Sequence, residues 1–159
     1  MTINKNNIYN NLINLTRNEK LYKTFTSNDT FNDRLIIFLL HLSFFFENYK
    51  SKSKSQKKNM QELFDYCFRQ IESSIREVGH GDVTVNKKMK EYINFFYFIV
   101  KKTNNWHKIN IDQKIEIVQN ILHITSNCVD LVNYIDKYIN FLSNNTLNSF
   151  SKSVLEDQF

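Results

Sequence analysis

Few residues of this chain have the types and spacing that catalysis or metal binding requires. A metal site needs several ligands at matched spacing, whereas the histidines stand alone on different segments. These are His41, His80, His107 and His123. The Gly79-His80-Gly81 segment lacks the third glycine of a dinucleotide-binding loop, and no Walker-type, GxSxG or HExxH motif occurs. Glu72 and Glu77 could form an acid–base pair, but helical neighbours of this kind are usually solvated. The sequence therefore predicts no enzyme, no metal site and no cofactor.

The stretch most suited to a specific role is 76–90, which reads REVGHGDVTVNKKMK. It holds both glycines of a chain that has no proline. Because glycine tolerates the left-handed conformation that ends many helices, we expect Gly79 to be the C-terminal cap of a helix over about residues 56–77. The next helix is predicted to begin near Thr84, which can cap it. The two glycines thus make one defined bend.

Charges around this bend conflict with the helices beside it. A helix N-terminus favours acids, yet Lys87, Lys88 and Lys90 crowd the first turns of the later helix, with only Asp82 nearby. Glu77 lies at a helix C-terminus, where a negative charge is unfavourable, whereas Arg76 is well placed. Local rules broken in this way often mark functional sites. The alternative is that Glu77 bonds across the loop to the lysines and closes the turn on itself.

The element that must position everything else is a helix over about Phe31–Asn48. Thr30 and Asp33 have the spacing of a capping box, and the run that follows is apolar on nearly every face. Such a helix belongs at the centre of a core. It is shorter than the roughly 20 apolar residues that span a bilayer, and His41 interrupts it. Arg34 and His41 share one face; they are candidate site residues, but a solvated arginine and a satisfied core histidine is the favoured interpretation.

Apolar residues at three and four spacing predict further helices, and no strand pattern occurs. We therefore predict an all-α single domain of about five to six helices over residues 1–145, with a polar, frayed tail over 146–159. A short helical turn is expected at Leu21, Tyr22 and Phe25. The basic run Lys50–Lys58 is predicted to be a solvated loop, either a plain connector or a soft contact with phosphates or anionic headgroups.

The composition fits one folded domain and leaves the partner open. The chain has 159 residues and a formal net charge of +5, which is compatible with RNA, anionic lipid or acidic protein. Cys67 and Cys128 make neither a disulfide framework nor a CxxC site, and Cys67 is expected to be a buried small hydrophobe. The N-terminus has no apolar signal-peptide core.

The stretch 76–90 resembles the signature of the ubiquinol–cytochrome c chaperone family, in which an RExGxGD turn precedes a valine and a Lys-Lys helix start. Other segments agree with the family pattern in order and spacing. These are Tyr9 to Arg17 with Tyr22, residues 28–34, Leu40-His41 and Phe96-Tyr97. The resemblance extends over about residues 8–142.

The resemblance implies an assembly factor and not an enzyme. Members of the family help newly made cytochrome b enter respiratory complex III, together with a small partner protein and near the ribosomal exit tunnel. The implied location is peripheral, at the bacterial inner membrane on its cytoplasmic side or at the matrix side of the mitochondrial inner membrane. The expected client- or partner-binding residues are Arg34, His41, Arg76, Glu77, Gly79, Gly81, Asp82, Lys87, Lys88, Met89, Phe96 and Tyr97.

A second hypothesis stays open beside the resemblance. The basic run and the exposed lysines also suit an RNA- or ribosome-binding helical module, in which phosphate contacts would make affinity fall steeply with salt. No contact with DNA is expected.

Overall fold

A computed structural model describes residues 3–19, 21 and 29–152. The described residues fold into one all-α domain without strands, which confirms the predicted fold class. The α-helices are α1 (Lys5–Thr16), α3 (Phe31–Asn48), α4 (Lys54–Glu77), α5 (Asp82–Thr103), α6 (Ile111–Leu122), α7 (Val129–Asn144) and α8 (Leu147–Lys152), and a 3₁₀ helix, η1, spans Trp106–Lys108. The predicted turn at Tyr22 and Phe25 lies outside the described residues.

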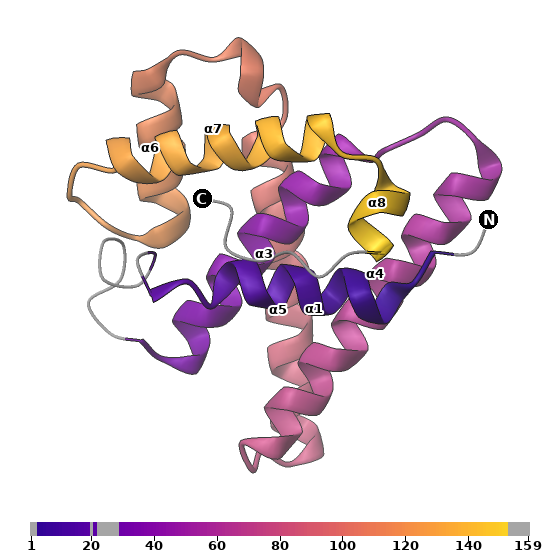
Figure 1. Ribbon diagram of the computed structural model, residues 1–159. Helices are drawn as coiled ribbons and strands as arrows, with labels where there is room; N and C mark the ends of the chain where they lie inside the picture. Colours follow the sequence, from indigo (N-terminus) through magenta and orange to yellow (C-terminus); the bar gives the residue numbers. More distant parts are fainter. Residues whose placement is uncertain (1–2, 20, 22–28, 153–159) are drawn as a thin grey trace.

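Helix α3 lies at the centre, as its sequence predicts (Figure 1). Its start is the predicted capping box: the Asp33 amide donates to the Thr30 hydroxyl at 3.1 Å, and the Asp33 carboxylate accepts from the Thr30 amide at 3.2 Å. Nearly every side chain from Leu35 to Phe45 is buried. Helices α1, α5 and α7 pack around it. An element that is apolar on all faces is thereby removed from water on all faces.

Helices α6 and α7 form a second layer beside α3. A capping box of Asn110 and Gln113 starts α6, and His123, in the left-handed conformation at φ 52°, ends it. Residues 123–128 separate α6 from α7. Cys67 and Cys128 are both buried and form no disulfide in the described part of the chain, and the burial of Cys67 was expected from its place on the apolar stripe.

Three boundary predictions were wrong. Helix α4 begins at Lys54, so half of the basic run is helical and not a loop. Helix α5 begins at Asp82 with Gly81 as its N-cap, two residues before the predicted start, because Asp82 itself favours a helix N-terminus. The tail is not frayed over 147–152: these residues form α8, because Phe150 is buried against Phe45 at a ring-centroid distance of 5.0 Å.

Within the described ranges, no helix is long and apolar enough to cross a membrane. The same residues contain no group of three or more side chains that could hold a metal ion.

Candidate functional site

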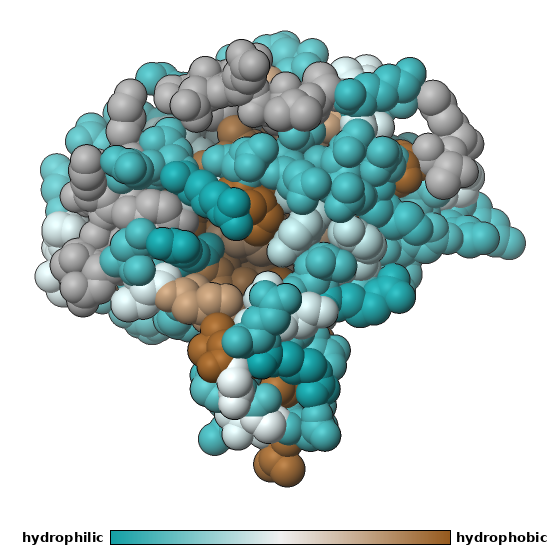
Figure 2. Space-filling view, turned by 60° about the horizontal axis from the view of Figure 1, so that its bottom comes forward, coloured by the Kyte–Doolittle hydropathy of each residue, from teal (hydrophilic) through white to brown (hydrophobic). Residues whose placement is uncertain are grey.

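Helices α4 and α5 form an antiparallel hairpin whose turn lies far from the core. Figure 1 shows both helices extending beyond the other elements, and Figure 2 shows the hairpin as an arm with hydrophobic atoms at its outer end. Two apolar side chains at this end are strongly exposed, Val78 at 58% and Val83 at 85%. Apolar side chains left in water at the end of an arm are candidates for contact with another molecule.

The turn at the end of the hairpin depends on one of its two glycines. Gly79 has φ +103°, and its amide donates to the Arg76 carbonyl at 2.9 Å, which closes the last turn of α4. This confirms its predicted role in ending the helix. Gly81 adopts an extended conformation that any residue can take, with φ −76° and ψ 168°. Nothing lies within 4 Å of the position of an added Cβ at either glycine.

The charges at the turn form a clasp, but with other partners than those expected. Arg76 pairs with Glu72 at 3.0 Å and with Asp82 across the turn. The hydrogen bonds that Arg76 donates, first to the Asp82 carboxylate and then to that of Glu72, raise the pKa of Arg76. In the described part of the chain, Glu77 and Lys87 form no ion pair, so the suggested bond between Glu77 and the lysines is absent. Asp82 takes that place because it starts α5 and faces Arg76.

A groove follows the hairpin from its turn to the body. Two adjoining hollows of about 660 and 500 Å³ make it up, and Phe64 lines both. We call this surface the hairpin groove. Its apolar residues are Met60, Phe64 and Phe68 from α4, Met89, Ile93, Phe96, Tyr97 and Val100 from α5, and Phe46 from α3.

Aromatic contacts hold the floor of the hairpin groove. The rings of Phe64 and Phe68 lie 4.4 Å apart, and Phe64 contacts Phe96 at 5.5 Å and Tyr97 at 6.1 Å. Phe96 is buried, whereas Tyr97 is 57% exposed and Met89 is half-buried. A floor that is fixed by packing and open to solvent can bury a further apolar segment with little reorganisation. Of the candidate residues, Met89, Phe96 and Tyr97 meet here.

Two other candidate residues lie away from the hairpin groove. His41 is 2% exposed: Nδ1 lies 2.7 Å from the Ile37 carbonyl oxygen, and Nε2 lies 2.7 Å from the Tyr134 hydroxyl. Burial lowers the pKa of His41 to about 4. The favoured interpretation, a satisfied core histidine, fits this environment, and the buried ring cannot touch a partner in this conformation. Arg34 is exposed and makes two hydrogen bonds, at 2.6 and 2.8 Å, to the Asp29 carboxylate.

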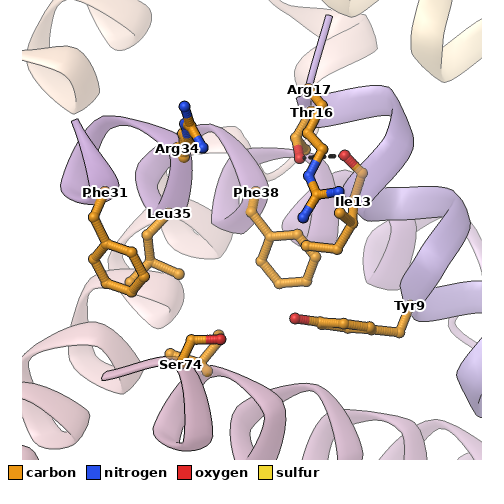
Figure 3. A pocket seen from close by; sticks show the side chains of 10 residues that line it. Tyr9, Ile13, Thr16, Arg17, Phe31, Arg34, Leu35, Phe38 and Ser74 are labelled. Atoms are coloured by element: carbon orange, nitrogen blue, oxygen red, sulfur yellow. Dashed lines mark hydrogen bonds between the residues drawn. The ribbon is translucent and has the colours of Figure 1, made fainter. Parts of the chain in front are cut away.

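Arg34 borders a second, smaller pocket between α1, α3 and α4, which encloses about 170 Å³ (Figure 3). Tyr9 and Arg17 also line it, so residues from two segments of the family pattern meet at one place. Burial raises the pKa of Tyr9, and the positive charge of Arg17 acts in the opposite direction. No spacing in the sequence pointed to this pocket, because its residues come from three elements that only the fold brings together.

Comparison with protein families gives the decisive observation. The sequence model of the ubiquinol-cytochrome C chaperone family matches residues 23–105, which is more than half of the chain. The chain belongs to this family. The matched region contains α3, the whole hairpin and the hairpin groove. Searches of curated proteins and of solved structures gave no match.

Proposed function

We propose that this member of the ubiquinol-cytochrome C chaperone family helps to assemble respiratory complex III without catalysing a reaction, and that it holds an apolar segment of newly made cytochrome b in the hairpin groove. The observation that carries the proposal is the place of the groove. It lies on the hairpin, which is entirely within the part of the chain that the family matches.

The chemistry of the groove suits a segment of a membrane protein. Such a segment exposes aliphatic and aromatic side chains that aggregate in water, and its transfer onto the groove removes apolar surface of both partners from water. The polar rim of Asp65, Arg69 and Lys90 near the turn leaves the apolar strip bordered by charge. Borders of this kind limit how far an apolar partner can spread and so give it one position.

The turn of the hairpin offers a different contact, suited to a small partner assembly factor. Lys87 is exposed, and Lys88 is half-buried one position further on. Neither lysine forms an ion pair with any residue that the structure describes. An acidic surface on a partner would offset the repulsion between these lysines and the partial positive charge at the N-terminal end of α5. The turn residues Arg76, Gly79 and Asp82 then serve to hold this end in shape.

The basic run is the proposed contact with the membrane surface or the ribosome. Lys50 and Lys57 border the end of the hairpin groove that lies nearest the body. Lysines in the first turn of α4 are unfavourable for that helix, and Ser53 provides no side-chain cap there. Phosphate groups of anionic lipid or ribosomal RNA would offset this positive charge. The proposal places the protein peripherally, at the cytoplasmic side of a bacterial inner membrane or the matrix side of a mitochondrial one.

The test is a cross-linking pull-down in cells, read for cytochrome b, together with the amount of complex III in a deletion strain. We expect cytochrome b to be captured by the wild type and complex III to be lost on deletion. The double variant Lys87→Glu with Lys88→Glu and the single variant Tyr97→Asp should capture less cytochrome b. The matched control, Lys108→Glu with Lys137→Glu, reverses two exposed charges away from the hairpin and should behave as wild type. Intact complex III in the deletion strain would refute the proposal.

The basic run also favours a second candidate, an RNA- or ribosome-binding module. If this is the main function, affinity for ribosomes should fall steeply between about 50 and 200 mM salt, because each phosphate contact releases a counterion. A Lys52→Glu, Lys54→Glu variant should flatten this dependence while Tyr97→Asp leaves it unchanged. Binding that does not respond to salt excludes this candidate.

A further inference from the structure

The pocket between α1, α3 and α4 has the structure of a small ligand site and is separate from the hairpin groove. Its apolar lining residues include Phe31, Leu35 and Phe38 of α3 and Ile71 of α4. Phe38, Leu35 and Ile71 are buried, whereas Phe31 leaves 41% of its surface in water at the edge. A volume of about 170 Å³ is close to the roughly 150 Å³ of an apolar cavity that holds a benzene ring.

Two hydrogen-bond donors border this space, from the half-buried Tyr9 and the exposed Arg17. Figure 3 shows the Tyr9 hydroxyl and the Arg17 guanidinium directed to the same side of α3 as Phe38, while Arg34 points away from that ring. Among the residues that the structure describes, no hydrogen bond or ion pair engages the Tyr9 hydroxyl or the Arg17 side chain. Arg34, by contrast, is held by Asp29.

The charged residues that line the pocket favour a negatively charged ligand. Arg17 and Arg34 are among the lining residues, and no carboxylate is. A guanidinium binds a carboxylate through two parallel hydrogen bonds, and a tyrosine hydroxyl can donate a third. The Ser74 hydroxyl, which donates to the Gln70 carbonyl at 3.0 Å, adds a polar point to the opposite wall. An uncharged hydrocarbon would make none of these hydrogen bonds.

We propose that this pocket binds an organic carboxylate with a compact apolar body of about the size of one aromatic ring. The apolar body lies among Phe31, Leu35 and Phe38, and the carboxylate accepts hydrogen bonds from Arg17 and Tyr9. Two sources share this chemistry: a free small acid, and the carboxyl-terminal residue of a polypeptide. Because the walls come from three helices, the bound ligand joins α1 to α3 and α4 and stabilises the folded chain. The proposal does not depend on the cytochrome b function.

The test uses the full chain and two pairs of probes in calorimetric titration. 3-Phenylpropionate represents the free acid, and N-acetyl-phenylalanine represents a polypeptide end; the corresponding amides lack the carboxylate. We expect each acid to bind at least about tenfold more tightly than its amide, because hydrogen bonds to a charged group are the stronger ones. The acid that binds more tightly identifies the source. Binding of neither acid, or equal binding of acids and amides, overturns the proposal.

Single substitutions test whether the acid binds in this pocket. Arg17→Gln should weaken the acid by about tenfold, and Tyr9→Phe, which removes one hydroxyl and keeps the ring, by a smaller factor of about threefold. Arg69→Gln, which removes an exposed arginine from the other side of the protein's α4 helix, is the matched control and should bind as wild type. The thermal midpoint of the wild type should rise with acid concentration, and that of Arg17→Gln should not. Equal affinity of the wild type and Arg17→Gln would place the ligand elsewhere and overturn the assignment.

Discussion

Helix α3 and the α4–α5 hairpin are both rich in phenylalanine, but they use these side chains differently. In α3, Phe44 contacts Trp106 at 5.3 Å and Phe45 contacts Phe150 at 5.0 Å, with no more than 3% of either phenylalanine exposed. In the hairpin the aromatic residues pack on one another along a groove, and Tyr97 keeps 57% of its surface in water. The body uses its aromatic residues to close a core, whereas the hairpin displays part of them.

This difference predicts that substitutions in α3 mainly affect stability, whereas substitutions on the hairpin groove mainly affect binding. A side chain of α3 is surrounded on all sides, so its loss leaves a cavity that the neighbours cannot fill. A side chain on the hairpin groove has protein on one side only, so its loss removes contact area for a partner more than it removes packing. The two regions should therefore respond to substitution in opposite ways, and the predictions below test this from the largest effect to the smallest.

The largest effect is expected for Phe45→Ala in the centre of α3. Phe45 is fully buried and contacts the rings of Tyr49 and Phe150. Removal of a buried phenylalanine ring typically lowers the free energy of unfolding by about 3–5 kcal/mol. Urea unfolding followed by circular dichroism measures the change. Tyr97→Ala is the matched control on the hairpin and should lower stability far less; an equal loss would contradict the separation of the two regions.

The second prediction concerns the pH dependence of the body. The folded-state pKa of His41 is about 4, below its ordinary value of 6.5, because burial disfavours the charged ring. Between about pH 4 and pH 6.5, the histidine is therefore protonated in the unfolded chain and neutral in the folded chain. Its contribution to stability is full above pH 6.5 and is lost as the pH falls through this range. At about 1.36 kcal/mol per pKa unit, the loss between pH 7 and pH 5 is on the order of 2 kcal/mol.

Comparison of the wild type with His41→Gln isolates this contribution. The variant should be less stable at pH 7, because the bond to Tyr134 and the contact with the Tyr138 ring at 4.8 Å are altered. Its stability should nevertheless fall less than that of the wild type between pH 7 and pH 5, as measured by urea unfolding at both values. Parallel pH profiles of the two proteins would mean that His41 does not titrate as a buried base.

Local rules predicted the parts of the fold that depend on neighbouring residues in sequence. The capping box at Thr30 and the C-terminal glycine of α4 each follow from backbone groups that need partners within a few residues. The apolar run of α3 predicted its central position for a similar reason, since it has no polar face to present to water. The stripe at three and four spacing in α4 likewise gave one buried face, which includes Cys67.

Two of the errors arose where a side chain contacts a residue outside its own helix. The tail was predicted to be frayed because it is polar. Phe150, however, packs against Phe45 of α3, and this contact holds α8 on the body. Arg76 pairs with Asp82 because the turn places the two residues side by side. This placement depends on α5 starting at Asp82. The hairpin groove and the pocket at Tyr9 and Arg17 combine residues from two or more helices, and no sequence spacing encodes such a combination.

A matched pair of glycine substitutions tests the hairpin turn. Gly79→Ala forces a side chain into a φ of +103°, which should lower the free energy of unfolding by about 1–2 kcal/mol. Gly81→Ala introduces no strain, since φ is −76° and the added Cβ meets nothing within 4 Å. Its weaker helix cap and its less flexible unfolded chain act in opposite directions, so its stability should stay close to that of the wild type. Equal effects in urea unfolding would mean that the turn differs from the one described.

The smallest effect on stability is expected for Arg76→Gln at the end of the hairpin. Its pairs with Glu72 and Asp82 lie in water, with 43% of the arginine side chain exposed, and ion pairs of this kind contribute little. The shift in the urea midpoint should be smaller than that of Gly79→Ala and should vanish in about 1 M salt, where charges are screened within about 3 Å. Asp82→Asn is the control, and the double variant should lose less stability than the sum of the two single losses, because both remove the same ion pair. A loss as large as that of Phe45→Ala would show that the hairpin end belongs to the same cooperative unit as the core. A small loss in stability, combined with weaker capture of cytochrome b, would instead assign the clasp to the binding surface.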